Sequence, residues 1–346
     1  MSKTVSSGNS LLLAVGILVL LAFTFLLFKA ITGGLSHGPN PTTTLNQSFN
    51  STPSTTTVSG PTTTVWSGRV VSLGYSGIAN ITYCDGQVLS IFYPPSYAAG
   101  RSYPTLVFIH GGGWSKGNGG TWHVQENQGE NLFLNSSFIV VNVDYRLAPQ
   151  YQFPAMIEDV KCAVRFLRAN AARYGINSTR IAADGGSAGS HLALLLGVAN
   201  RSSGWDTGPY LNYSSSVRAV IDQYGPANLT NPYFYNLHSG LKGGYLFQNV
   251  FDLTSPTQPA AYADSPVYLV SPGDSPFLIV QGEEDTVVPY NQSVMMYNSL
   301  RSKGDAAQFI SVANAGHGFV QVSSSPISPS LTQIHQDELA FLQKYD

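Results

Sequence analysis

The stretch "IAADGGSAGSHLALLLG", residues 181–197, places one serine, Ser187, two positions from a glycine on either side. Those glycines are Gly185 and Gly189; a short apolar run precedes them and a longer one follows. This order predicts a buried strand over 180–184, a sharp turn at Ser187 and an apolar helix directly after it. Glycines suit such a turn because strand and helix approach closely there and leave no space for side chains.

A serine held at such a turn can act as a nucleophile. A serine hydroxyl is weakly nucleophilic at neutral pH, so it needs a base to take its proton and donors to bind the developing oxyanion. The glycine spacing favours this interpretation of Ser187 over an incidental serine in a glycine-rich turn. At this kind of turn, the acid and the base follow the serine in the order Ser, Asp or Glu, His.

Both partners occur in that order. Asp285 follows the apolar run 277–280. His317 stands between two glycines and follows the next apolar run. We expect His317 to take the hydroxyl proton and Asp285 to orient the imidazole and stabilise its charged form. Glu283 and Glu284 are adjacent to Asp285 and compete with it for the acid role.

The segment "FIHGGGWSKG", residues 108–117, leads from a predicted strand directly into consecutive glycines. Backbone N–H groups of such a loop can face a ligand directly and form an oxyanion hole. The candidate donors are amides of this glycine loop and the amide of Ala188, the residue after the serine.

Two histidines and a tryptophan near these motifs receive other roles. His110 is expected to brace the glycine loop, and Trp114 is a candidate for the pocket wall. His191 lies four residues after Ser187, which points its side chain back along the helix. We therefore expect His191 to pack or to make a structural hydrogen bond.

Strand and helix patterns alternate along the chain from about Trp66. Six short apolar runs are predicted strands: 105–109, 138–143, 180–184, 218–222, 277–280 and 308–312. Helical spacing is present over 154–174 and at the C-terminal end over 332–345. This alternation predicts an α/β fold with a mainly parallel, doubly wound sheet covered on both faces. The polar and aromatic interval 201–264 is predicted to be a cap insertion over the carboxyl edge of the sheet.

Five motifs in this order resemble the α/β-hydrolase fold, in particular the hormone-sensitive-lipase-like esterases and their relatives that act on acylated plant polymers. They are "HGGGW" (110–114), "DYRLAP" (144–149), "GGSAG" (185–189), "GEEDTVVP" (282–289) and "AGHGF" (315–319). The resemblance covers roughly residues 68 to 345. It implies that Ser187, Asp285 and His317 form the triad and that no metal or organic cofactor is needed. It also implies that the oxyanion donors are the amides of Gly112, Gly113 and Ala188, with Gly111 as a further candidate.

Two positions depart from the pattern of these relatives. Gly186 precedes the serine, where relatives often carry a larger side chain, and Gln281 stands where many have histidine. Neither position performs the chemistry, so the resemblance to the superfamily stands while the subfamily is left open.

The N-terminal region differs from the rest of the chain. Leu11 to Phe28 is an apolar run whose only polar side chain is Thr24, and at 1.5 Å per residue it extends ~27 Å. It ends without a signal-peptidase site, which favours an uncleaved anchor. The predicted order is therefore a short tail (1–10), a transmembrane signal-anchor helix (11–31), a Thr/Ser/Pro-rich stalk (32–65) and the hydrolase domain (66–346).

Composition favours a location outside the cell. The 346 residues carry a formal charge of −2 and only 10% charged side chains, which gives no basic surface for nucleic acid. Nine N-x-[ST] sequons are present, at Asn46, Asn50, Asn80, Asn135, Asn177, Asn200, Asn212, Asn228 and Asn291. Cys84 and Cys162 lie far apart and are predicted to be free thiols.

These observations predict a membrane-anchored, extracellular serine carboxylesterase that hydrolyses short acyl or aromatic acyl esters. Its expected partners are a small-molecule or polysaccharide-linked ester and, through the N-terminal helix, a lipid bilayer. A serine peptidase or amidase of the same fold remains an alternative, and so does a non-catalytic surface binding protein.

Overall fold

The computed structural model describes residues 69–72, 75–118, 128–239 and 245–345. The predicted tail, anchor helix and stalk, together with residues 66–68 of the predicted hydrolase domain, therefore lie outside the described residues. Within the described part of the chain, no helix combines the length and apolar character needed to cross a bilayer.

The core of the fold is one nine-stranded sheet in the order β1-β2-β3-β5-β4-β6-β7-β8-β9. Its strands are β1 (Arg69–Ser72), β2 (Tyr75–Thr82), β3 (Val88–Phe92), β4 (Tyr103–Ile109), β5 (Ile139–Val143), β6 (Ile176–Gly186), β7 (Val220–Gln223), β8 (Phe277–Gly282) and β9 (Ala307–Val312). From β5 to β9 every neighbouring pair is parallel. The six predicted strands fall on these six elements.

The antiparallel edge is the part of the sheet that the sequence patterns did not predict. Strands β1, β2 and β3 pair antiparallel, and β3 pairs antiparallel with β5. The side chains of β2 alternate only weakly between partly buried and exposed positions, because this strand lies near the sheet's edge. Its period-two signal is correspondingly faint.

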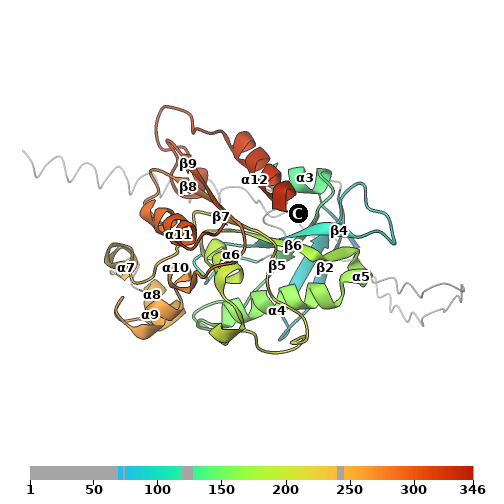
Figure 1. The fold of residues 1–346 in the computed structure, drawn as a ribbon, viewed down its shortest axis with the longest axis horizontal. Coiled ribbons are helices and arrows are strands. Elements are labelled where there is room, and N and C mark those ends of the chain that lie inside the picture. The colour runs from blue at the N-terminus through green and yellow to red at the C-terminus, as the bar shows by residue number, and fades with distance from the viewer. Residues whose placement is uncertain (1–68, 73–74, 119–127, 240–244, 346) are drawn as a thin grey trace, which may run out of the picture. The chain divides into compact units, whose positions relative to one another are not determined.

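Helices cover both faces of the sheet (Figure 1). They are α3 (Gln128–Asn135), α4 (Ala155–Ala169), α5 (Ala171–Tyr174), α6 (Ala188–Val198), α7 (Pro232–Ser239), α8 (Tyr245–Phe251), α9 (Pro259–Ala263), α10 (Pro266–Leu269), α11 (Asn291–Ser302) and α12 (Leu331–Tyr345). Alternate residues of β8 enter the two cores: Phe277 packs with α4 and α6, and Leu278 packs with α3 and α12. This two-sided burial is why the central strands read as continuous apolar runs.

The predicted cap interval 201–264 is divided by β7, which is an inner strand of the sheet. Residues before β7 connect the end of α6 to the amino edge of the parallel strands. Residues after β7 leave from the carboxyl edge, where Ser187 lies. The strand predicted over 218–222 is this β7, so the interval 201–264 is not one continuous insertion but two separate connections.

The two cysteines form a disulfide, so the prediction of two free thiols is wrong. Cys84 follows β2 and Cys162 lies on α4, with their Cα atoms 6.3 Å apart although 78 residues separate them in the sequence. That separation hides the pairing, because only the packing of α4 against the sheet brings the two positions together. The bond ties the antiparallel edge to the helical layer.

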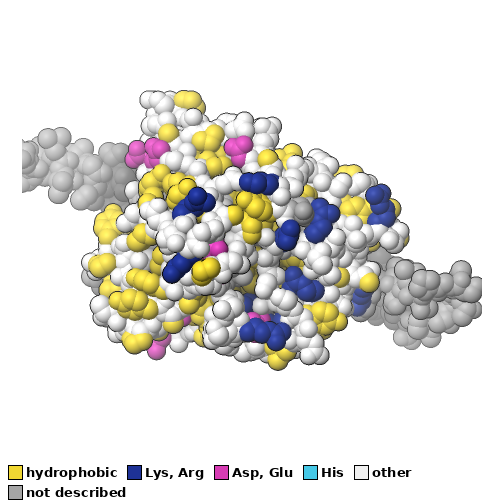
Figure 2. All heavy atoms as spheres, viewed as in Figure 1, with side chains coloured by type: hydrophobic (Ala, Val, Ile, Leu, Met, Phe, Trp, Pro, Cys, Tyr) yellow, Lys and Arg dark blue, Asp and Glu magenta, His cyan; other side chains and the backbone are white. Residues whose placement is uncertain are grey.

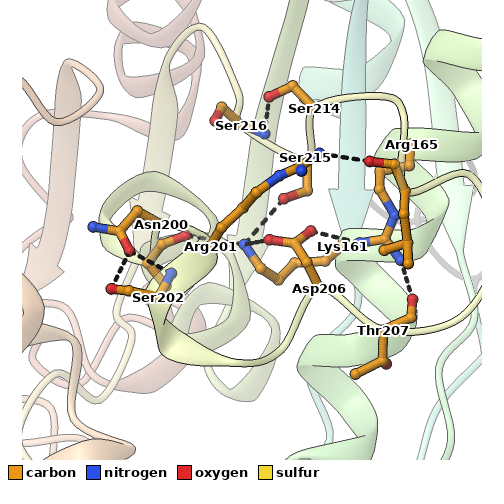
Figure 3. Close-up of polar contacts among 12 residues, drawn as sticks. Lys161, Arg165, Asn200, Arg201, Ser202, Asp206, Thr207, Ser214, Ser215 and Ser216 are labelled. Atoms are coloured by element: carbon orange, nitrogen blue, oxygen red, sulfur yellow. Dashed lines mark hydrogen bonds and ion pairs between the residues drawn. The ribbon is translucent and has the colours of Figure 1, made fainter.

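Charged side chains are sparse on the face of the molecule that Figure 2 shows, where most atoms are white or yellow. Some of the chain's few cations are instead buried on α4, where Lys161 and Arg165 are at most 1% exposed. Both pair with Asp206 in the loop before β7, at 3.3 Å and 2.6 Å (Figure 3). Lys161 Nζ also donates to the carbonyl of Ala199 at 2.9 Å and to Ser215 Oγ at 3.0 Å. The pairs and hydrogen bonds anchor this loop to α4.

Replacing Asp206 with alanine should destabilise the domain, because it leaves two buried cations without their shared carboxylate. We expect the free energy of unfolding to fall by about 3 kcal/mol, measured by urea denaturation. Asp252→Asn is the matched control, since Asp252 is exposed and should leave the stability near that of the wild type. Equal stabilities of Asp206→Ala and Asp252→Asn would contradict this role of the cluster.

Candidate active site

Ser187 occupies the sharp turn between β6 and α6. Its backbone has φ 56° and ψ −120°, a left-handed conformation that is strained for any residue other than glycine. A Cβ at Gly189 would overlap the carbonyl oxygen of Ile109 and lie 2.5 Å from that of His110. A Cβ at Gly185 would lie 2.5 Å from the carbonyl oxygen of Gly189. The two flanking glycines therefore permit the approach of strand and helix that presents the serine.

Ser187, His317 and Asp285 form one hydrogen-bonded chain. His317 Nε2 lies 3.0 Å from Ser187 Oγ, and His317 Nδ1 lies 2.8 Å from Asp285 Oδ2. Asp285 leaves the carboxyl end of β8, and His317 begins the short helical turn η2 (His317–Phe319) after β9. These distances suit proton transfer from the serine to the imidazole.

The carboxylate of Asp285 is fixed on both oxygens. Its Oδ1 accepts hydrogen bonds from the amides of Val287 and Val288 at 2.8 and 2.9 Å. Its Oδ2 accepts from Gln281 Nε2 at 3.1 Å as well as facing His317. Asp285 is 6% exposed. The competing residues Glu283 and Glu284 are exposed to solvent, and Glu283 accepts a hydrogen bond from Ser311 Oγ instead.

Gln281 is a site residue whose role the sequence reasoning missed. It is completely buried at the end of β8, and its Nε2 donates to Asp285 and to the carbonyl of Val288, at 3.1 Å each. Its Oε1 accepts from Ser293 Oγ at 2.8 Å. The available signal was a glutamine inside an otherwise apolar strand, where an unpaired amide would be costly.

The glycine loop after β4 reaches the same site. Gly112 and Gly113 have φ of 108° and 61°, and a Cβ on Gly112 would overlap the carbonyl of Lys116. Gly111, Gly112 and Gly113 line one cavity with Ser187 and His317. Ala188 begins α6, and amides of a helix's first turn have no intrahelical acceptor. The expected oxyanion donors therefore lie beside the serine.

His110 stabilises this glycine loop, as expected from the sequence. Its Nδ1 lies 2.7 Å from the carbonyl oxygen of Gly111, and its ring stacks on Tyr145. Tyr145 Oη in turn donates to the carbonyl of His110 at 2.8 Å. Burial lowers the pKa of His110, which favours the neutral ring.

His191 and Trp114 pack against one another beneath the cavity. Burial lowers the pKa of His191 to about 4, and its Nε2 lies 2.8 Å from the carbonyl oxygen of Asp264. The ring of Trp114 meets those of His191 and Phe251 edge-on, at 5.3 and 5.0 Å. Trp114 is 2% exposed but contributes to the cavity wall. His191 is thus a core histidine that the triad does not use.

The cavity above Ser187 has a volume of about 590 Å³. Helices α7 and α8 contribute Phe234, His238 and Leu246 to its wall. His238 Nε2 lies 2.8 Å from the carbonyl oxygen of Val287. This contact ties α7 to the loop that carries Asp285, so the part of the predicted cap after β7 borders the site.

The sheet, the turn at Ser187 and the order of its partners define an α/β-hydrolase. Residues 89–300 match the BD-FAE family. The chain belongs to this family. Ser187 and Asp285 lie inside the matched residues, whereas His317 lies beyond them.

Similar proteins are esterases. The chain is 32% identical to esterase LipQ of Mycobacterium tuberculosis over 249 aligned residues. The alignment covers 70% of this chain and 57% of LipQ. It is 27% identical to esterase LipC of the same organism over 254 residues, and this alignment covers 70% of this chain and 61% of LipC. The chain thus spans less than two thirds of the length of either relative.

Solved structures share the fold. A truncated form of a carbohydrate esterase from gut microbiota has 25% identity and a TM-score of 0.64, over 78% of this chain and 95% of that one. Esterase Est2 of Thermogutta terrifontis has 20% identity and a TM-score of 0.62, over 79% and 94%. At that identity Est2 supports the fold alone.

Valine at position 189 should destabilise the whole domain, because its side chain would meet the backbone of β4. We expect Gly189→Val to lower the free energy of unfolding by about 3 kcal/mol, measured by chemical denaturation. Ser187→Ala, at the same turn, is the control and should remain within about 0.5 kcal/mol of the wild type. A Gly189→Val protein as stable as Ser187→Ala would show that strand and helix do not need this close contact.

Proposed function

We propose that this protein is a serine carboxylesterase. The observation that carries the proposal is the hydrogen-bonded chain from Ser187 Oγ through His317 to Asp285, which opens on the cavity lined by Gly112 and Gly113. The esterase relatives support the same reaction class. Such a site can act on acyl groups, because the triad supplies a nucleophile and a proton acceptor and the glycine loop supplies oxyanion donors beside them.

In this mechanism, His317 Nε2 takes the proton of Ser187 Oγ as the oxygen attacks the ester carbonyl carbon. The resulting oxyanion accepts hydrogen bonds from the amides of Gly112, Gly113 and Ala188. His317 then gives its proton to the leaving alcohol oxygen, and the bond to that oxygen breaks to leave an acyl-enzyme. Asp285 holds the Nδ1–H and stabilises the imidazolium throughout.

Deacylation repeats these steps with water. His317 takes a proton from water, the hydroxide oxygen attacks the acyl carbon, and the second oxyanion uses the same amides. The proton then returns from His317 to Ser187 Oγ as the carboxylic acid leaves. The full cycle converts one ester and one water molecule into one carboxylic acid and one alcohol.

The substrate class we propose is short acyl or aromatic acyl esters, including those linked to polysaccharides. A cavity of about 590 Å³ walled by Phe108, Phe234, Leu246 and Phe319 suits an apolar or aromatic group. The structural similarity to the carbohydrate esterase from gut microbiota supports a sugar-linked ester.

We further propose that the domain lies outside the cell, held by the apolar segment 11–31. The disulfide supports this location, since such bonds persist in oxidising compartments. Of the seven sequons in the described residues, Asn177 is partly buried and Asn228 is buried. The other five asparagines are exposed: Asn80, Asn135, Asn200, Asn212 and Asn291.

Changing the triad tests the reaction. Ser187→Ala and His317→Ala should each abolish nearly all hydrolysis of p-nitrophenyl acetate, and a fluorophosphonate should label the wild type but not Ser187→Ala. Asp285→Asn should lower kcat on the order of 10⁴-fold, because the imidazole adopts the wrong tautomer. Hydrolysis by Ser187→Ala at the wild-type rate would reject the mechanism.

Glu284→Gln is the matched control for the acid. Glu284 is exposed next to Asp285, so its replacement should change kcat little. Inactivation by Glu284→Gln together with an active Asp285→Asn would reverse the assignment. An amide analogue of the same acyl group, hydrolysed faster than the ester, would favour a peptidase or amidase instead.

Topology is tested with intact cells that express the full chain. Protease added outside should release a fragment of about the size of the hydrolase domain, while a cytoplasmic marker protein stays whole. Survival of the domain until the cells are opened would place it on the inner side of the membrane.

A further inference from the structure

Helix α12 contributes a further histidine, His335, to the cavity of Ser187, which His317 and His238 also line. His335 is 7% exposed and lies in the cavity wall together with Leu331 from the start of the same helix. The proposed mechanism uses only His317, so it leaves this histidine without a role.

A chain of buried polar groups holds His335 in place. His335 Nδ1 lies 3.0 Å from Glu338 Oε2, and Glu338 Oε1 accepts from Gln223 Nε2 at 3.0 Å. Gln223 Nε2 also lies 3.4 Å from Asp184 Oδ2. Glu338 is completely buried, and Gln223 and Asp184 are at most 3% exposed.

This chain connects directly to the nucleophile turn. The carbonyl of Gln223 accepts the amide hydrogen of Ser187 at 2.9 Å, while its side chain holds Glu338. Burying a carboxylate and a histidine is costly, and an apolar pair of similar size would serve the packing of α12 better. The polar chain therefore fixes the His335 ring at a defined place relative to Ser187.

The orientation of His335 decides which atom is available to a ligand. Its Nδ1 is engaged by Glu338, so Nε2 is the remaining polar atom of the ring, and no hydrogen bond to it occurs within the described residues. The cavity that His335 lines is mainly apolar or aromatic, with Phe108, Phe319 and Leu331 also in its wall. Nε2 accepts a hydrogen bond when the ring is neutral and donates one when it is protonated. A hydroxyl can satisfy either state.

We propose that His335 is a specificity-determining residue that hydrogen-bonds through Nε2 to a hydroxyl on the acyl or the alcohol portion of the substrate. Glu338 and Gln223 are positioning residues that act through it. The inference deepens the proposed ester hydrolysis and rests on it.

The test uses two pairs of esters that differ only in one ring hydroxyl. The first pair is methyl 3-phenylpropanoate and methyl 3-(4-hydroxyphenyl)propanoate; the second is 2-phenylethyl acetate and 2-(4-hydroxyphenyl)ethyl acetate. In one of the pairs, wild-type kcat/KM should favour the hydroxylated ester about 10-fold, the worth of one hydrogen bond to a buried partner. The pair that responds identifies whether His335 contacts the acyl or the alcohol side.

His335→Phe keeps a planar ring and removes Nε2, so the hydroxyl preference should fall to about 1. Because this change strands the buried carboxylate of Glu338, the double variant His335→Phe/Glu338→Leu should give the same ratio without an unpaired charge. The control is Leu331→Ala, which removes only apolar contact. It should lower kcat/KM for both members of a pair and leave their ratio at the wild-type value.

The outcomes separate this inference from the proposed function. A wild type that hydrolyses both members of each pair equally contradicts the role of His335 and leaves ester hydrolysis standing. So does a hydroxyl preference that survives in His335→Phe or in the double variant. A folded wild type that hydrolyses neither these four esters nor p-nitrophenyl acetate contradicts the proposed function itself.

Discussion

The close contact between α6 and β4 is the constraint on which the site depends. With no side chain at Gly189, the helix meets the backbone of Ile109 and His110 directly. Ser187 immediately precedes that helix and the glycine loop leaves that strand, so one contact sets the distance between nucleophile and oxyanion donors. The left-handed backbone of Ser187 is strain that this packing sustains.

The acid and the base depend on a different part of the sheet. Strands β8 and β9 are parallel neighbours, so the loops that follow them open at the same edge and bring Asp285 to His317. The parallel direction of these two strands would not by itself fix the orientation of the Asp285 carboxylate. Two amides and the buried amide of Gln281 hold it, and Ser293 on α11 holds Gln281 in turn. The triad is thus supported from the helical layer as well as from the sheet.

Sequence predicted the features that are encoded locally. The turn at Ser187, the glycine loop and the six parallel strands each carry their signal within about ten residues, and the order of motifs placed Asp285 and His317. Pairings set by the fold escaped prediction. The disulfide between Cys84 and Cys162, and the path from Gln223 to Glu338 and His335, join segments that only sheet register and helix packing bring together. No local pattern reports such contacts.

The disulfide also changes what a cut in the chain would do. Between its two cysteines the chain passes through the exposed connection of residues 95–102, which links β3 to β4, and exposed connections are where proteases cleave most readily. A domain cleaved there would consist of two polypeptides joined by the disulfide, which would migrate as one molecule in non-reducing gel electrophoresis. They would separate only when the disulfide is reduced, so under oxidising conditions such a cut would stay undetected until a thiol reached the bond.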